Sequence, residues 1–585
     1  MVLDQLHGAS TTFGKIMNKN LTATQNDYAY FLPATSGFYS TFIGKQRYGN
    51  YVDPVRLPQS FTNGVEGLNY LEPDKGMFYY DHCLYSAGHA NLDLSKQDDS
   101  EDMFRNRDRT TSWVLGDSGG FQIGKGVWEG EWNDPNGPVV AQRMAEAVAK
   151  GVELVPQLHP TGHPKTDKNG NPKFNKIDHV KIYQAKLDAA QKKREQVLAW
   201  MDTLMDYGMV LDIPAWVCRS PAGIKATGIS TYQEAVEATK YNNEYFIKHR
   251  TGACKFLNVL QGENHTDAEH WYDEMKKFCD PKQYDKPFNG WAMGGQNMCD
   301  VHLVLKRLVT LRFDGLLEKG HQDWMHFLGT SKLEWAVLLT DIQRAVRKYH
   351  NENFTISFDC ASPFLATANG QIYMATETPN GDKWVYRMQA SADDKKYSTD
   401  TRLFKDAVVQ DGIFDRFESS PIIDQVLMKD ICIYAPGDLN KVGKEGRTSW
   451  DSFTYAIMMG HNVWMHCNAV QEANRQSDAG IIPAMLSATT ADRSHRDYSP
   501  APNKFKDIVD LIFSIDNRQD ALDLVEFYGA YFDSIIGTRG NTGDRITNAS
   551  AKADEFGFPA VDFSDLKTVK SEKATPILNN SLFEF

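Results

Sequence analysis

Residues 113–122 have the sequence WVLGDSGGFQ, in which a short apolar segment is followed by an acid, a hydroxyl group, two glycines, an aromatic ring and an amide. The apolar part is typical of a buried strand, and the glycines allow positive φ and a close approach to the backbone. Phe121 provides a face for stacking, and Asp117 provides a carboxyl group for hydrogen bonding or proton transfer. A turn of this composition can hold a flat heterocyclic ring. A structural strand-to-helix turn accounts for the same residues, so other segments have to decide.

Further apolar segments end in polar or glycine residues in the same way. They are residues 77–80, 209–211, 256–260, 290–293, 326–328 and 356–358. Apolar residues at helical spacing lie between them, at 197–205, 301–308 and 338–346. Strands that alternate with helices predict an α/β protein, and this number of units favours a (β/α)8 TIM barrel over an open sheet.

The residues that follow the expected strands indicate a site, because chemistry in such barrels gathers at the carboxyl ends of the strands. Three acids and one amide occupy these positions, namely Asp117, Asp212, Asp359 and Gln261. Each has a simpler explanation when taken alone. Asp212 precedes Ile-Pro and would serve as a turn cap, and Asp359 would serve as a buried acid held by backbone donors. Their joint occurrence at strand ends favours a site.

The regular alternation ends near residue 365, which divides the chain. We expect a catalytic barrel region at 1–365, with residues 160–176 as an exposed insertion rich in Pro, Gly and Asn. We further expect an inserted strand and loop region at 366–448, helices that complete the barrel and C-terminal region at 449–537, and a polar tail at 538–585. The strands expected beyond the barrel are 371–374 and 384–386, and the helices are 450–474 and 505–532. The expected fold class is a (β/α)8 TIM barrel with insertions and an α+β C-terminal extension.

Composition excludes two classes of protein. The chain has 585 residues, 41% of them hydrophobic, and a formal net charge of −13. These values exclude a disordered chain and a uniformly basic nucleic-acid binder. Local basic patches remain open, either as phosphate contacts or as solvated loops: Lys395-Lys396 with Arg402 and Lys405, residues 441–447 and residues 493–506.

The eight cysteines are widely spaced and form no Cys-x-x-Cys pair, which is typical of reduced thiols in a cytosol-like compartment. The N-terminus has no continuous apolar segment, and no apolar run is long enough to span a membrane. We therefore expect a cytoplasmic protein without a membrane partner.

Five motifs occur in an order and approximate spacing that resemble the tRNA-guanine transglycosylase superfamily. They are DSGGFQ at 117–122, LQG at 260–262, GWAMGG at 290–295, FLGT at 327–330 and FDC at 358–360. The resemblance covers about residues 75–365, with a weaker similarity at 450–474. It implies a (β/α)8 barrel enzyme, a pentosyltransferase that exchanges a guanine in nucleic acid for a 7-deazaguanine base.

The resemblance also implies roles for individual residues. Asp359 would attack the sugar C1′ and form a covalent glycosyl-aspartate, and Asp117 would manage the proton of the departing and the incoming base. This logic parallels that of retaining glycosidases. The residues that the resemblance implies for binding the base are Ser118, Phe121, Asp212, Gln261, Gly290, Trp291 and Leu328. Among these, Asp212 would accept hydrogen bonds from N1–H and the amino group of the base. Gln261 and the Gly290 N–H would donate hydrogen bonds to O6. Phe121 and Leu328 would lie on the two faces of the ring.

Two departures from the family pattern narrow the range of expected substrates. Gly295 stands where bacterial tRNA enzymes of this family have a glutamate for a cationic substituent, so a neutral base such as 7-cyano-7-deazaguanine (preQ0) is expected. The family's zinc motif is not evident, since only Cys432, His466 and Cys467 lie near its place and their spacing is unsuitable. We therefore expect no metal and no cofactor.

Residues 195–216 are most similar to the DpdA-type, phage DNA 7-deazaguanine transglycosylase branch. The expected partners are DNA and a free 7-deazaguanine base such as preQ0, in the host cytoplasm if the protein is phage-encoded, and a homodimer is left open. Three alternatives also remain open: a divergent enzyme acting on tRNA, a non-catalytic partner subunit, and an unrelated (β/α)8 glycosidase.

Overall fold

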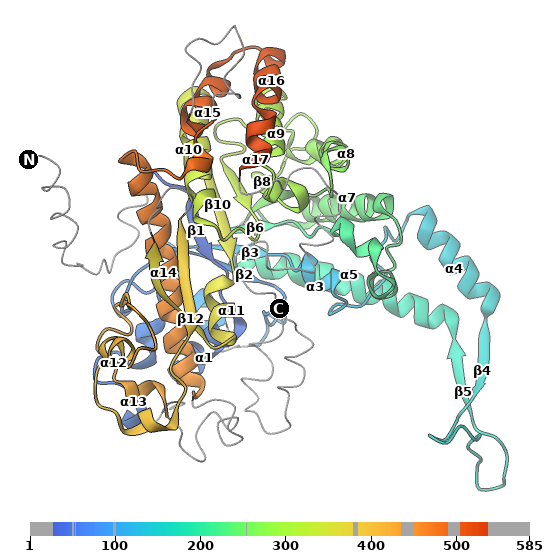
Figure 1. The fold of residues 1–585 in the computed structure, drawn as a ribbon. Coiled ribbons are helices and arrows are strands. Elements are labelled where there is room, and N and C mark those ends of the chain that lie inside the picture. The colour runs from blue at the N-terminus through green and yellow to red at the C-terminus, as the bar shows by residue number, and fades with distance from the viewer. Residues whose placement is uncertain are drawn as a thin grey trace, which may run out of the picture. The chain divides into compact units, whose positions relative to one another are not determined.

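The computed structural model of the chain (Figure 1) describes residues 27–48, 52, 54–96, 101–252, 254–377, 384–433, 450–488 and 504–535. These residues form two compact units. The first unit contains the described residues up to Leu115 and those from Met298 onward, and the second contains residues 116–297.

An eight-stranded parallel sheet has the order β1-β10-β9-β8-β7-β6-β3-β2. Its strands are β1 Tyr30–Pro33, β2 His82–Ser86, β3 Trp113–Asp117, β6 Tyr207–Met209, β7 Lys255–Leu260, β8 Gly290–Met293, β9 Trp324–Phe327 and β10 Thr355–Cys360. The sheet is nearly closed, because Ala34, just after β1, bridges to Leu84 of β2 and the Thr35 N–H donates to the Leu84 carbonyl at 2.9 Å. The α/β class and the barrel architecture are thereby confirmed.

Strands such as β7 and β10 are buried on both faces, as expected for parallel strands covered by helices. The helices of the barrel region are α1 Gly37–Tyr48, α2 Asp102–Arg105, α3 Gly120–Gly124, α4 Pro138–Lys150, α5 His179–Leu204, α6 Pro221–Thr227, α7 Tyr232–His249, α8 His265–Met275, α9 Val301–Phe313, α10 Leu333–Tyr349 and α11 Ser362–Ala368. Several begin at side chains that cap them, such as Asp178 before α5 and Asp300 before α9.

Residues 160–176 are exposed, as expected, and belong to a longer hairpin. Strand β4 (Val152–Pro156) pairs antiparallel with β5 (Phe174–Asp178), and two further bridges extend the pairing into the connecting segment.

The first unit continues beyond the barrel with the expected mixture of strands and helices. β11 (Gln371–Glu377) pairs antiparallel with β12 (Val385–Ala390). The helices that follow are α12 Phe404–Gln410, α13 Met428–Ile431, α14 Ser452–Asp478, α15 Phe505–Ser514, α16 Arg518–Phe527 and α17 Gly529–Ser534. The helix expected at 450–474 is α14, whereas the segment at 505–532 forms three helices and not one.

The strand expected at 77–80 is wrong. That segment turns back on residues 67–70, since the Met77 N–H donates to Gly67 and the Tyr80 N–H to Tyr70, each at 2.8 Å. The strand of the sheet begins at His82. The tail expected at 538–585 and the patch at 441–447 lie outside the described residues, and only the last residues of the patch at 493–506 are described. Within the described ranges, no helix has the length and apolar character needed to cross a membrane.

Candidate active site

The turn after β3 is shaped by two glycines. Gly119 has φ +85°, and a Cβ there would lie 2.5 Å from the ring of Trp128. A Cβ on Gly120 would lie 2.9 Å from Oδ1 of Asp212. Ser118 is buried, and its hydroxyl group donates to the Val210 carbonyl at 3.2 Å, which ties the turn to the end of β6. The turn therefore brings the backbone directly against the Asp212 carboxylate.

Asp212 is the buried acid of this cluster, with 6% of its surface exposed. Its Oδ2 accepts a hydrogen bond from Nε2 of Gln261 at 2.8 Å. Burial raises the pKa of Asp212 to about 7; the Gln261 bond opposes this shift, and the negative charge of Asp117 adds to it. Asp117, Asp212 and Gln261 thus belong to one electrostatically coupled group in the second unit.

The glycines after β7 and β8 exclude side chains around Gln261. A Cβ on Gly294 would lie 2.8 Å from Nε2 of Gln261. Gly295 has φ +55°, and a Cβ there would lie 2.3 Å from the Gly262 carbonyl oxygen. Local packing in this chain therefore requires a glycine at position 295.

Two of the expected base-binding residues, Gly290 and Trp291, lie on opposite faces of β8. The Trp291 side chain is fully buried, and its ring centroid lies 6.1 Å from that of Tyr272 on α8. Side chains alternate along a strand, so Gly290 and Ala292 face the opposite side, toward the inside of the barrel. Gly290 is the first residue of β8, in register with Leu257 of β7. Trp291 thus packs against a helix, and Gly290 borders the interior.

Phe121 is an exposed aromatic side chain, with 43% of its surface accessible. Its ring centroid lies 6.0 Å from that of Trp216, and Nζ of Lys125 lies 5.4 Å from the Phe121 ring and 5.8 Å from the Trp216 ring. Trp216 was not expected here from the sequence. It follows β6 in a short 3-10 helix, Ala215–Arg219, and nothing in its immediate sequence distinguishes it from a core aromatic residue.

Asp359 lies in a hydrogen-bonded chain within the first unit. Its Oδ1 accepts from the Gly329 N–H at 2.9 Å and lies 3.1 Å from Nε2 of His326. Nδ1 of His326 lies 2.8 Å from Oγ of Ser357, which also accepts from Nε1 of Trp324 at 2.8 Å. Both ring nitrogens of His326 thus have oxygen partners, and Nε2 is placed to donate to the Asp359 carboxylate.

These hydrogen bonds use only one of the two oxygens of the Asp359 carboxylate. Asp359 is 8% exposed and His326 is fully buried. Both hydrogen bonds of the carboxylate go to Oδ1, so Oδ2 has no hydrogen-bond partner among the described residues. Leu328, at the end of β9 and next to Gly329, is half-buried. The carboxylate is held from one side and available on the other, as a nucleophile requires.

His326 and Ser357 are functional candidates that we did not expect from the sequence. Their register could have indicated them, because Ser357 is aligned with His326 across β9 and β10 and Asp359 follows Ser357 by two positions. Residues two apart on a strand face the same side.

Cys432 and His466, which the sequence places near an expected zinc motif, do not fit a metal site. Sγ of Cys432 donates to the Ala392 carbonyl at 3.3 Å. The ring of His466 stacks on Phe31 at 4.1 Å and on Tyr386 at 4.6 Å, and burial lowers the pKa of His466 to about 3. In the part of the chain that the structure describes, no group of three or more His, Cys, Asp or Glu side chains is placed to hold a metal ion.

The expected basic patch around Arg402 is neutralised locally. Arg402 forms ion pairs with Asp400 at 2.6 Å and Asp411 at 2.9 Å, and Lys405 pairs with Asp424 at 2.6 Å. These bonds favour a structural role over a phosphate contact.

Comparison with known proteins adds no assignment to this geometry. No protein-family model matches the chain, and no curated protein matches it.

Proposed function

We propose that this protein is a guanine transglycosylase that replaces guanine in DNA by a 7-deazaguanine base such as preQ0, through a covalent glycosyl-aspartate. The observation that carries the proposal is the contrast between two buried carboxylates. Asp359 is held through one oxygen only, and Asp212 is paired with an amide. Both follow or end strands of the parallel sheet at the carboxyl side, where barrel enzymes have their chemistry.

Base recognition is assigned to Asp212 and Gln261. Guanine presents two adjacent donors, N1–H and the amino group, next to the acceptor O6. A carboxylate accepts from both donors. The Nε2 amide group of Gln261 has two hydrogens, of which one is bound by Asp212, so the other is available for O6. The exposed ring of Phe121 supplies a stacking face.

The chemical steps are assigned to Asp359 and Asp117. Oδ2 of Asp359 attacks C1′, the bond from C1′ to N9 of guanine breaks with its electron pair, and Asp117 protonates the departing base. The same group then takes the N9 proton of the incoming 7-deazaguanine, whose N9 attacks C1′ and releases the Asp359 carboxylate. Two inversions retain the configuration, and no external energy source is consumed.

A neutral substituent on the incoming base is supported by Gly295. No side chain fits at that position, since a Cβ would lie 2.3 Å from the Gly262 oxygen. An acid at this place would pair with a cationic substituent, so its absence favours a nitrile. The lack of a fitting zinc site among the described residues favours DNA over tRNA as the acceptor.

Nucleoside mass spectrometry tests the proposal directly. The purified protein is incubated with preQ0 and either duplex DNA or unmodified tRNA, with the Asp359→Asn variant as the matched control. Modified deoxyguanosine with the wild type alone is expected. Modification of tRNA alone would assign the enzyme to tRNA, and modification of neither with any 7-deazaguanine would contradict the enzyme assignment.

A further inference from the structure

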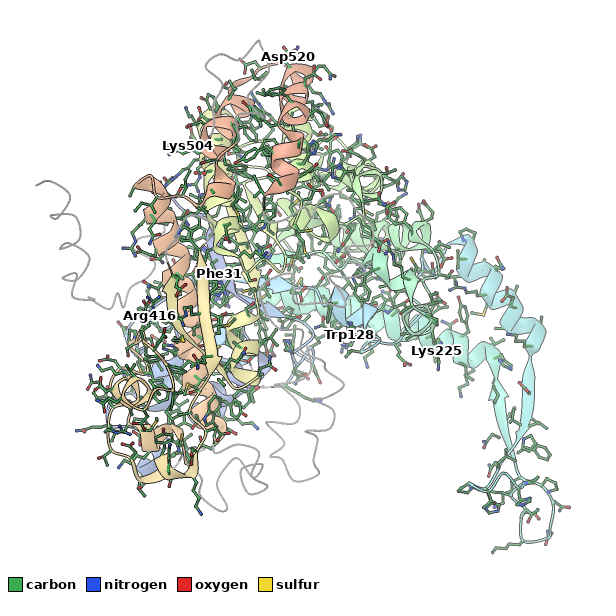
Figure 2. All side chains as sticks on the ribbon, viewed as in Figure 1. Phe31, Trp128, Lys225, Arg416, Lys504 and Asp520 are labelled. Atoms are coloured by element: carbon green, nitrogen blue, oxygen red, sulfur yellow. The ribbon has the colours of Figure 1, made fainter. Side chains whose placement is uncertain are left out.

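The hairpin β4–β5 and its flanks, residues 150–186, form an arm of the second unit that the proposed reaction does not use. We call it the β4–β5 arm. Figure 1 shows β4 and β5 continuing beyond the ends of α4 and α5, and Figure 2 shows side chains standing out on both sides of this ribbon. Isolated two-stranded ribbons are marginally stable, because they have no core beneath them. The length and exposure of the β4–β5 arm therefore indicate a binding role.

The arm is basic in an acidic protein. Its seven lysines contrast with three acidic residues and with the net charge of −13 of the whole chain. The lysines are Lys150, Lys165, Lys168, Lys173, Lys176, Lys181 and Lys186, and none forms an ion pair within the described residues. The acids are already engaged: Glu153 with His179, Asp178 as the cap of α5, and Asp167 by the N–H groups of Asn169 and Asn171.

Two of the lysines lie on adjacent backbone segments. The Lys173 N–H donates to the Lys165 carbonyl at 2.7 Å, and the Lys165 N–H donates to Gln157 at 2.6 Å. Neighbouring like charges on a ribbon oppose its pairing unless an anion lies between them. The cluster therefore favours an anionic partner.

The arm also gathers apolar side chains on its surface. Six of the twelve large hydrophobic side chains that are exposed in the described part of the chain belong to the arm or its edge: Val148, Val152, Leu154, Leu158, Phe174 and Ile182. Leu154 pairs with Lys176 and Pro156 with Phe174, so Leu154, Phe174 and Lys176 lie on one face of the ribbon. An exposed face that combines apolar and cationic groups marks an interaction site.

We propose that the β4–β5 arm binds duplex DNA, with its lysines on the phosphates and the face of Leu154 and Phe174 in a groove. A two-stranded ribbon fits the major groove, and apolar side chains can wedge between base steps. A second copy of this chain is a poorer occupant, because two basic arms repel each other. The assignment rests on the proposed function in taking DNA as the partner, since a target base must leave the duplex before it can react.

The test measures binding of the full-length protein to a short duplex DNA by fluorescence anisotropy over a range of salt, with no 7-deazaguanine present. The arm variant is Lys165→Gln/Lys168→Gln/Lys173→Gln. The matched control is Lys248→Gln/Lys282→Gln/Lys286→Gln, which removes three exposed lysines elsewhere in the same unit, none of them in an ion pair within the described residues. Each lost phosphate contact lowers the slope of log K against log salt by about 0.9.

We expect the arm variant to bind at least about tenfold more weakly than the wild type, with a slope reduced by about 3, and the control to bind as the wild type does. Unchanged affinity and slope in the arm variant would overturn the proposal. A dimer that is lost in Leu154→Ser/Phe174→Ser, with unchanged DNA binding, would also overturn it and assign the face to a second copy. Arm-dependent DNA binding without any base exchange would support the arm and contradict the proposed function alone.

Discussion

At the scale of single residues, Asp359 has a specific hydrogen-bonding environment. His326 and the Gly329 N–H both hold Oδ1, which orients Oδ2 without using it. Asp359→Asn retains the shape and the acceptor for these donors but removes the proposed nucleophile. We expect base exchange to fall by about 10³-fold or more and the unfolding midpoint to change little, as checked by nucleoside mass spectrometry and thermal unfolding. Exchange near the wild-type rate would contradict the role of Asp359.

The proposed role of Asp212 in base recognition predicts that base binding depends on pH. Its raised pKa, about 7, means that the free protein holds a neutral carboxyl below pH 7 and a carboxylate above it. Only the carboxylate accepts from both N1–H and the amino group, so affinity for preQ0 is expected to fall about tenfold per pH unit as the pH drops below 7, and to level off above it. Titration calorimetry between about pH 5 and 9 measures this profile. Asp212→Asn should bind weakly with no inflection near pH 7, and a flat wild-type profile would refute the assignment.

At the scale of elements, the turn from β3 to α3 has a glycine where the Asp212 carboxylate packs closely against the backbone. Gly120 has an ordinary backbone conformation, so alanine there meets no conformational barrier, but its methyl group would lie 2.9 Å from Oδ1 of Asp212. We expect Gly120→Ala to weaken preQ0 binding by roughly 1–2 kcal/mol while changing stability less.

The control for this turn is Gly137→Ala, at the cap of α4, where the nearest atom would lie 3.2 Å away. Its affinity for preQ0 should equal that of the wild type. Equal losses in both variants would show that the packing of Gly120 against Asp212 has no specific effect on the base.

At the scale of the whole molecule, an aromatic layer at the amino ends of the strands helps to close the barrel. Tyr30 of β1 stacks on His82 of β2 at 4.2 Å, and His82 stacks on Trp113 at 5.1 Å. Trp324 of β9 lies 6.5 Å from Tyr30. Because β1 and β2 are the two edges of the sheet, their stacked rings replace some of the hydrogen bonding that an interior strand pair would have.

Loss of the Tyr30 ring should therefore lower the free energy of unfolding of the protein without changing the type of reaction. We expect Tyr30→Ala to lower the free energy of unfolding by about 2–3 kcal/mol and Tyr30→Phe by less than about 1 kcal/mol, measured by denaturant titration. A similar loss in both variants would mean that the hydroxyl group and not the stacked ring is what matters.

The expected site residues differ in how far local sequence could predict them. Asp117, Asp212, Gln261 and Asp359 follow or end strands, so their position could be predicted from apolar segments and the polar residues after them. The burial of Trp291 against α8 could not be predicted, because the side of a strand that packs on a helix depends on which elements cover it. His326 and Ser357 were missed because their pairing needs the register of β9 against β10, which sequence spacing does not contain.

The sequence by itself determined the secondary structure of most of the barrel and the exposure of the insertion at 160–176. Apolar runs, helical periodicity and net charge are local properties, so they can be evaluated from neighbouring residues. Only the tertiary structure decided that β1 and β2 close the sheet, that 77–80 turns back on 67–70, and that burial raises the pKa of Asp212. These features depend on desolvation and on hydrogen bonds between segments far apart in the chain, which exist only once the chain has folded.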